Sequence, residues 1–344
     1  MPSALPLAVA RRLAALRLPR LVPDAAALPL MHPTLVGDVP AGPGWLFELK
    51  WDGVRVLALR ARGAVRLLAR RGGEVTRVYP EVAAALGAFP GGDLALDGEI
   101  VALDAAGRPS FERLARRMHL TAGPAIAAAA RSVPATALFF DLLVVDGRDC
   151  RALPLAARKA LLRALVPAAA AVRYCDHVDD DGPAFFAAVC RAGLEGVVAK
   201  RAEAPYRGGR SREWLKVKRQ RVEDFVIGGW TDPRGGRPGL GAVHLGRFDG
   251  RALVHVGRAG AGLGDRQLGE LAARLRRLAV ARCPFTRGDP PRGPEHHWVR
   301  PTLVCVVRFT EWTNDGKVRH PVFVGLRPQR RARDVRIEAA TPRS

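Results

Sequence analysis

Apolar and polar residues follow two different periods along the first two thirds of the chain, which predicts a mixture of strands and helices. Apolar runs bounded by turn residues predict strands over residues 93–104, 135–147 and 194–201. Apolar residues spaced three and four apart predict helices over residues 109–120 and 155–166. The Ala-rich stretch 122–134 is of low complexity, and we expect it to be a connection.

The pattern changes near KVKRQRVEDF, residues 216–225. Beyond it, short strand-like segments alternate with glycine turns, which is typical of a small all-β barrel. One helical pattern, over residues 265–280, interrupts the strands. We therefore expect an N-terminal arm over 1–22, an α+β domain over 23–222 and an all-β domain with a basic tail over 223–344. The arm is either a short amphipathic basic helix or a frayed segment.

The segment WLFELKWDGVRVLAL, residues 45–59, combines large apolar residues with charges. Because side chains alternate between the two faces of a strand, Phe47, Leu49 and Trp51 share one face. Glu48 and Lys50 then share the other with Asp52. We interpret this segment as a strand with one core face and one functional face.

Two further strands repeat this arrangement. In LALDGEIV, Asp97 and Glu99 share a face, and in WLKVK, Lys216 and Lys218 do. Cations near a lysine disfavour its protonated form, and a neutral lysine amine is a nucleophile. Carboxylates on neighbouring strands could hold magnesium, which takes oxygen ligands and bridges phosphates. This combination suits attack by a nucleophilic lysine on a nucleoside triphosphate.

Charge and cysteine content narrow the class of protein further. Lysine and arginine number 55 against 33 acidic residues, a formal charge of +22. Such a field favours a polyanionic partner such as nucleic acid, although a solvated basic surface would give the same sum. The five cysteines form no C-x-x-C pair, which favours a reducing cytosol. No apolar run approaches the ~20 residues of a membrane helix.

Each motif alone is weak, because K-x-D-G or D-G-E most often marks an ordinary turn. Seven motifs in order carry more weight, and together they resemble the ATP-dependent DNA ligases of the covalent nucleotidyltransferase superfamily. The likeness is greatest to the ligase module of bacterial DNA ligase D and its stand-alone relatives. The matching segments are ELKWDGVR (48–55), LLARRGGEVTRVYPEV (67–82), LDGEIVALD (96–104), FFDLLVVDG (139–147), LEGVVAKR (194–201), YRGGRSREWLKVK (206–218) and EWTNDGKVRHPVFVGLR (311–327).

The resemblance implies a fold and a set of roles. It implies an ATP-grasp-like adenylation domain, of the nucleotidyltransferase type, followed by an OB-fold domain. Lys50 would attack the α-phosphate of ATP and hold AMP. Glu99 and Glu195 would bind Mg²⁺ or Mn²⁺. The implied nucleotide-binding residues are Glu48, Arg55, Arg70, Glu99, Phe140, Arg212, Lys216 and Lys218, with Lys200, Arg319 and Arg327 as further candidates.

Two details depart from this pattern. Glu195 and Lys200 are five residues apart, so strict alternation places them on opposite faces unless a bulge or a strand end intervenes. The last motif of the family closes with arginine, any residue, aspartate and lysine, whereas here Arg327 is followed by Pro328, Gln329 and Arg330. The missing aspartate weakens the case for that motif in lysine adenylation.

The resemblance also implies a setting, which is bacterial repair of nicks and breaks, including end joining and recombination. We expect a monomer of the cytosol and nucleoid that acts on duplex DNA with nicks or ends. A Ku-like end-binding protein and separate polymerase or nuclease proteins would be its partners, since this chain lacks those modules. The alternatives are an RNA ligase or capping-type enzyme, and a non-catalytic DNA-binding scaffold.

Overall fold

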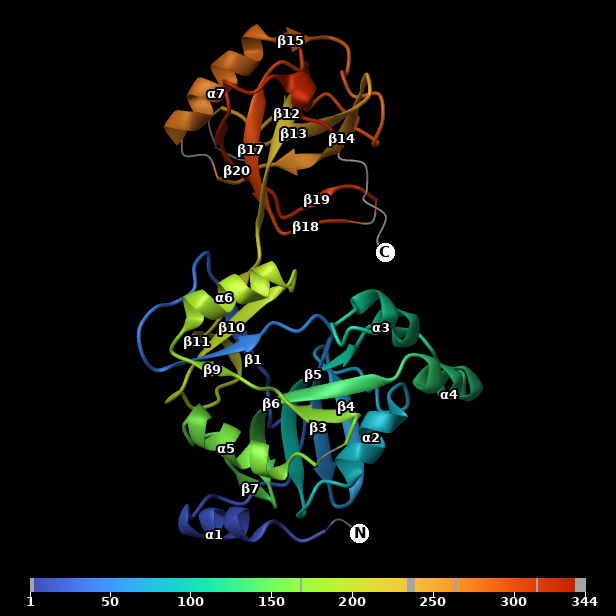
Figure 1. Ribbon diagram of the computed structural model, residues 1–344, viewed down its shortest axis with the longest axis vertical. Helices are drawn as coiled ribbons and strands as arrows, with labels where there is room; N and C mark the ends of the chain where they lie inside the picture. The colour runs from blue at the N-terminus through green and yellow to red at the C-terminus, as the bar shows by residue number, and fades with distance from the viewer. Residues whose placement is uncertain (1–2, 168, 234–238, 263–264, 314, 338–344) are drawn as a thin grey trace. The chain divides into compact units, whose positions relative to one another are not determined.

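The computed structural model describes residues 3–167, 169–233, 239–262, 265–313 and 315–337 (Figure 1). The chain divides into two compact units, Met1–Lys218 and Arg219–Ser344. This division lies a few residues before the predicted boundary at 222, because strand β12 (Arg221–Thr231) already belongs to the second unit. No helix in the described ranges is long and apolar enough to cross a membrane.

The N-terminal unit combines helices with two sheets. Its helices are α1 (Leu7–Ala15), α2 (Pro80–Gly87), α3 (Phe111–Met118), α4 (Gly123–Ser132), α5 (Leu155–Leu165) and α6 (Gly182–Arg191). Its strands are β1 (Met31–Leu35), β2 (Trp45–Leu49), β3 (Val54–Ala61), β4 (Ala64–Ala69), β5 (Leu94–Ala102), β6 (Ala135–Val145), β7 (Arg148–Asp149), β8 (Val172–Tyr174), β9 (Val178–Asp179), β10 (Gly196–Arg201) and β11 (Gly209–Lys218).

One sheet has the strand order β1-β11-β10-β2-β9 and the other the order β4-β3-β5-β6-β7, with β8 beside β6. Strand β6 is buried along its whole length, which explains its nearly unbroken apolar sequence. The main core forms around strands β3, β5 and β6 and helices α2 and α5, with Leu96, Phe139 and Leu162 fully buried.

The segment 45–59 is not one strand, as predicted, but two strands in different sheets. Strand β2 belongs to the five-stranded sheet and β3 to the six-stranded sheet. The chain crosses between them at residues 50–53. A Cβ atom at Gly53 would lie 2.1 Å from the Ile100 carbonyl oxygen, so only glycine fits this close approach. The crossing places Lys50 where the two sheets meet.

Other predicted elements are confirmed with small shifts at their ends, namely α3, α5, β5, β6 and β10. The stretch 122–134 is a correction, because Gly123–Ser132 forms helix α4 rather than a connection. Alanine is the best helix former, so composition favoured this helix although its periodicity was weak. The N-terminal arm contains helix α1, which buries Val9 and Leu13.

The C-terminal unit is an all-β domain with one long helix, which confirms the OB-fold prediction. Its strands are β12, β13 (Val243–Asp249), β14 (Ala252–Ala259), β15 (Ala279–Val280), β16 (His296–Val299), β17 (Val304–Phe309), β18 (Glu311–Trp312), β19 (Val318–Arg319) and β20 (Val322–Leu326). The helix is α7 (Asp265–Arg277), and a short 3-10 turn spans Ala332–Asp334.

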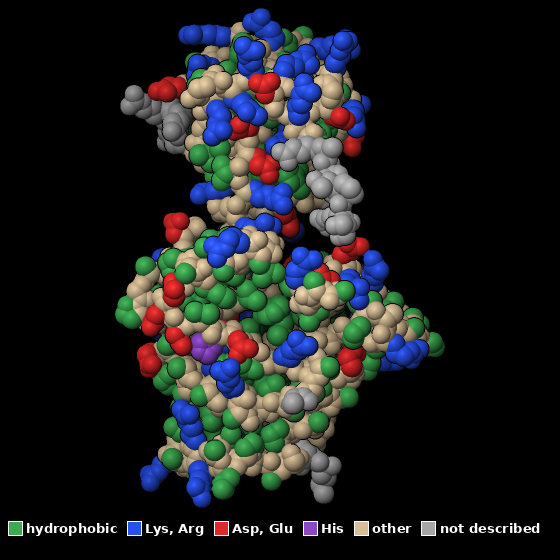
Figure 2. Space-filling view, viewed as in Figure 1, with side chains coloured by type: hydrophobic (Ala, Val, Ile, Leu, Met, Phe, Trp, Pro, Cys, Tyr) green, Lys and Arg blue, Asp and Glu red, His purple; other side chains and the backbone are tan. Residues whose placement is uncertain are grey.

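Strand β12 organises this unit. Its first half pairs with β17 and its second half with β16, while β13 runs along its other edge with a bulge between Ile227 and Gly229. Lysine and arginine side chains, drawn in blue, are numerous on the visible surface of this unit (Figure 2). The end of the predicted basic tail, residues 338–344, lies outside the described residues.

Candidate active site

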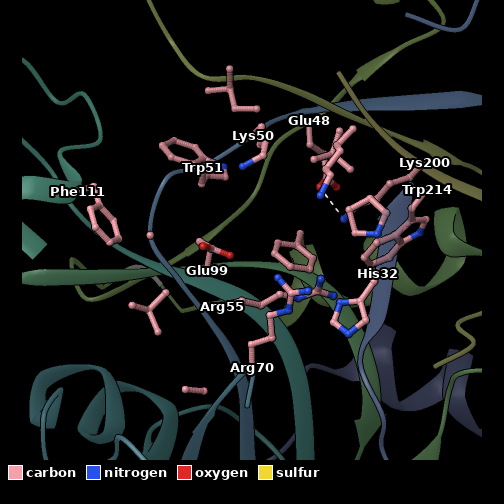
Figure 3. Close-up of a pocket in the computed structure, with 18 of the residues that line it drawn as sticks. His32, Glu48, Lys50, Trp51, Arg55, Arg70, Glu99, Phe111, Lys200 and Trp214 are labelled. Carbon is pink, nitrogen blue, oxygen red and sulfur yellow. Dashed lines mark ion pairs between the residues drawn. The ribbon is translucent and has the colours of Figure 1, made fainter. Parts of the chain in front are cut away.

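A pocket of about 470 Å³ lies in the N-terminal unit and is lined by residues from both of its sheets. Its wall includes Glu48 and Lys50 at the end of β2, Arg55 on β3, Glu99 on β5 and Lys200 on β10 (Figure 3). The remaining lining residues are His32, Pro33, Leu49, Trp51, Gly53, Val54, Ala69, Arg70, Arg71, Phe111, Met118, Phe140, Val198, Arg210, Trp214 and Lys216. Most of the predicted site residues therefore meet in one cavity.

Lys50 stands just beyond β2, and its backbone N–H donates to the Gly196 carbonyl oxygen over 2.9 Å. Its ammonium forms a 2.6 Å ion pair with Glu195, whose second oxygen lies 3.0 Å from Lys218. Glu195 precedes the first residue of β10, so the alternation along that strand does not apply to it. This strand end allows Glu195 to reach Lys50 while Lys200 also faces the pocket.

Further cations surround the nucleophile candidate. Lys216 and Arg70 line the same pocket as Lys50. Burial, followed by the charges of Lys50 and Lys218, lowers the pKa of Lys216. The lowered pKa reflects a dense group of positive charges, which suits an anionic ligand such as a triphosphate.

Glu48 departs from the expected open functional face, because it is buried with only 2% of its side chain exposed. One carboxylate oxygen lies 2.5 Å from the Lys159 ammonium and the other 2.7 Å from Lys200. The Lys200 ammonium also lies 4.0 Å from the ring centre of Phe140 and 4.1 Å from that of Trp214. The pocket thus has an aromatic end that carries one ion-paired carboxylate.

Arg55 is fixed by Asp97, the first carboxylate of the D-G-E motif. Its guanidinium donates to both oxygens of Asp97, over 3.0 and 2.7 Å, and to the Met31 carbonyl oxygen. The hydroxyl of Tyr206 donates to Asp97 over 2.7 Å and accepts from the Met31 backbone N–H. Asp97 therefore positions Arg55 in the pocket wall rather than facing a ligand itself.

Glu99 differs from these paired carboxylates. None of the described side chains is placed to donate a hydrogen bond to it, although Arg55 and Lys50 lie near enough to act through their charge. Burial raises the pKa of Glu99 to about 8 despite those two cations. A half-buried carboxylate in a pocket wall without a hydrogen-bond donor is typical of a ligand-binding position.

Glu195 contacts Lys50 without lining the pocket, and four further predicted residues neither line the pocket nor contact Lys50. Lys218 reaches the site only through Glu195, and Arg212 is exposed on β11 without lining the pocket. Arg319 and Arg327 belong to the C-terminal unit, where they pair with Glu311 at 2.8 Å and with Asp224 at 3.3 Å.

Sequence reasoning missed several residues of the pocket and its floor, namely His32, Trp51, Arg71, Phe111, Met118, Lys159, Arg210 and Trp214. Lys159 gave a signal, since it stands four residues after Leu155 and three before Leu162, on the apolar face of a helix. A lysine on such a face needs a buried partner.

Comparison with known proteins identifies the family. The model for the ATP-dependent DNA ligase domain matches residues 38–218, and the model for the ATP-dependent DNA ligase C-terminal region matches residues 236–330. The multifunctional non-homologous end joining protein LigD of Pseudomonas aeruginosa is 36% identical over 308 residues, which are 88% of this chain and 36% of LigD. A probable DNA ligase of Streptomyces coelicolor is 39% identical over 81% of this chain and 54% of that protein.

The solved ligase domain of Mycobacterium tuberculosis LigD is 33% identical to this chain, with a TM-score of 0.50. The alignment covers 92% of this chain and 100% of that domain. The chain spans between about a third and about half of the length of the two curated relatives named above. It belongs to the ATP-dependent DNA ligase family.

Proposed function

We propose that this chain seals nicks or breaks in duplex DNA through an adenylated lysine, Lys50. The observation that carries the proposal is the pocket itself, which presents a lysine nucleophile between a cationic region and an aromatic end. The Lys50 ammonium loses one proton, and the free amine forms a bond to the α-phosphorus of ATP. The bond from that phosphorus to pyrophosphate breaks, and the nitrogen loses a second proton while keeping the third. The product is a lysine–AMP phosphoramidate.

The two ends of the pocket bind different parts of the nucleotide. Bases stack on aromatic rings, so the adenine belongs beside Phe140 and Trp214. The phosphates then face the cations Arg70 and Lys216. Before attack, Lys50 must leave Glu195, because an ammonium held by a carboxylate has no free electron pair. Binding of the triphosphate favours this exchange, since its phosphates compete with Glu195 for the ammonium of Lys50.

The donors in the pocket fit a divalent cation that is bound together with ATP. The described residues hold no group of three or more His, Cys, Asp or Glu side chains that could bind a metal by themselves. Mg²⁺ usually takes one or two carboxylates and completes its shell with phosphate oxygens and water. Glu99 and Glu195 would supply those carboxylates. When bound, Mg²⁺ or Mn²⁺ would neutralise charge that develops on the phosphates.

The next two steps act on DNA. A terminal 5′-phosphate oxygen attacks the AMP phosphorus and Lys50 is released, which gives DNA–adenylate. The 3′-hydroxyl then attacks the activated phosphate, loses its proton, and AMP leaves. The arginine-rich surface of the C-terminal unit and the charge of +22 favour binding to the DNA backbone, so affinity should fall steeply with salt.

The relatives suggest a biological setting as well. LigD proteins carry end joining in their names, so we infer that this chain acts in bacterial break repair and recombination. A Ku-like end-binding protein, with polymerase and nuclease activities from other proteins, would complete that process.

Labelling with α-³²P-ATP and a divalent cation, without DNA, tests the first step. We expect acid-labile and base-stable label on the wild type and none on Lys50→Ala, with Arg62→Ala on an exposed turn as the control. Addition of nicked DNA should then transfer the label to DNA and yield sealed product. A wild type that binds ATP without becoming labelled would refute the adenylation mechanism, and transfer to nicked RNA alone would favour an RNA ligase.

A further inference from the structure

Glu48, Lys159 and Lys200 form a buried charged set beside the aromatic end of the pocket. Lys159 comes from helix α5 and does not line the pocket. Its ammonium contacts Glu48 at 2.5 Å, donates to the Cys175 carbonyl oxygen over 2.9 Å and lies 4.6 Å from the ring centre of Tyr174. These three contacts fix the Lys159 ammonium, and the ammonium in turn fixes the position of the Glu48 carboxylate.

The two lysines of this set behave differently. Burial opposes the charged form of Lys159, but Glu48, together with Cys175 and Tyr174, more than offsets it, so the pKa of Lys159 is raised. Burial lowers the pKa of Lys200, and the Lys159 charge lowers it further although Glu48 acts against both. Lys159 is therefore the more firmly charged partner of Glu48.

Composition supports a special requirement for lysine at this point. Of the 55 basic residues, only six are lysines: Lys50, Lys159, Lys200, Lys216, Lys218 and Lys317. Each is buried or half-buried, and five of them line the pocket or contact a carboxylate of the site. An arginine would bring a larger, planar guanidinium to the same place. Lysine is therefore found at the positions of this site where only a compact positive charge fits.

We propose that Lys159 is a positioning residue that makes the pocket select adenine over guanine by holding Glu48 as an ionised acceptor. This inference rests on the proposed nucleotide site. The amino group of adenine donates a hydrogen bond where guanine carries a carbonyl oxygen, which accepts. A carboxylate fixed beside the aromatic end attracts the amino group of adenine and repels the carbonyl oxygen of guanine. Lys200, as a donor, complements the ring nitrogen N1 of adenine, which in guanine carries a hydrogen.

Loss of Lys159 should weaken this discrimination. In Lys159→Met, Glu48 keeps only the Lys200 contact, so its carboxylate is no longer held from two sides and can turn away from the base. The other titratable groups whose charge acts within this set are Tyr174, Cys175, His177 and Asp141, the last of which is ion-paired with Arg158. Burial and the Lys159 charge lower the pKa of His177, and burial raises the pKa of Tyr174 and Cys175. None of these three shifted groups changes charge in the wild type between pH 7 and 8.

The test compares ATP with GTP on wild type, Lys159→Met and the control Arg163→Met, which removes an exposed cation from the same helix. The rate of covalent labelling with each α-labelled nucleotide gives the selectivity at pH 7 and 8. We expect constant selectivity for wild type and control. For Lys159→Met we expect a fall of about ten- to hundredfold, the scale of one charged hydrogen bond. Unchanged selectivity in that variant would overturn the proposal.

A binding measurement and a double variant distinguish failure of this proposal from failure of adenylation or of folding. Binding of the α,β-methylene analogues of ATP and GTP, by calorimetry, measures selectivity without chemistry, so a failure of Lys50 adenylation is distinguishable from a failure of this inference. The double variant Lys159→Met/Glu48→Gln removes both members of the buried pair and should fold even if Lys159→Met does not. Its selectivity should equal that of Glu48→Gln alone. A further loss on removing Lys159 in the Glu48→Gln background would show a role independent of Glu48 and refute the proposal.

Discussion

Acidification should destabilise the C-terminal unit through a buried row of histidines. Lys317 Nζ lies 3.3 Å from His255 Nδ1, His255 Nε2 lies 3.2 Å from His244 Nδ1, and His244 Nε2 lies 3.1 Å from His296 Nδ1. His296 Nε2 ends the row 3.2 Å from Glu295. An ammonium only donates and a carboxylate only accepts, so every imidazole donates from Nε2 and accepts at Nδ1. This hydrogen-bonded row, the histidine chain, requires neutral rings.

The size of the effect follows from two of these rings. Burial, with His255 and His296 nearby, lowers the pKa of His244 to about 3. Burial, with Lys317 nearby, lowers the pKa of His255 to about 4. In the unfolded chain both titrate near 6.5, so between these values the unfolded state binds more protons and stability falls as the pH falls. From pH 7 to pH 5 each ring should cost about 2 kcal/mol and the two together about 4 kcal/mol.

Urea unfolding at pH 7 and pH 5, followed by hydrogen exchange of the β13 and β14 amides, measures this loss in the C-terminal unit. In His255→Phe the loss between the two pH values should shrink by about 2 kcal/mol, whatever the variant costs at pH 7. His297→Phe is the matched control, because His297 pairs with Asp232 outside the histidine chain. An equal loss in wild type and His255→Phe would show that the buried rings do not titrate as we infer.

Three further predictions concern the N-terminal unit. Arg60 is buried and donates to backbone carbonyls between residues 86 and 92, so Arg60→Met should cost about 3 kcal/mol in urea unfolding. The Arg158–Asp141 ion pair is fully buried at 2.7 Å, so Asp141→Asn should cost about 3–5 kcal/mol, and replacing both partners by apolar residues should cost less. Because the pKa of Glu99 is raised to about 8, its ionisation in the unfolded chain opposes folding above pH 4.5. Glu99→Gln should therefore add about 3 kcal/mol of stability at pH 7 and less at pH 5, and it should abolish labelling with ATP.

Sequence patterns predicted the fold best where one periodicity extended over a whole element. Strands β5 and β6 and helix α5 follow from their own residues, because each buries a continuous apolar face. Helix α4 could not be predicted in this way, since a run of alanines shows little periodicity. The break between β2 and β3 could not be read from residues 45–59, because the reason for it is the Ile100 backbone, which packs against Gly53 from a distant part of the chain.

The same limit explains the errors at the site. Alternation along one strand placed Glu48 on an open face, but a strand in the middle of a sheet can be covered on both faces by other elements. Helix α5 covers Glu48 and places Lys159, a residue 111 positions away in the sequence, in contact with its carboxylate. Periodicity describes one element at a time, whereas an ion pair needs two.

The crossing of the chain between its two sheets explains why the sequence motif and the structure both point to Lys50. A nucleophile for a nucleoside triphosphate needs cations, carboxylates and an aromatic surface at once, and one strand has too few side chains on one face to supply them. Because β2 ends at Leu49 and β3 starts at Val54, the residue between them that carries the amine, Lys50, faces contributions from both sheets. The short motif around Lys50 was informative for this reason: its glycine allows the crossing and its lysine occupies the position that the crossing creates.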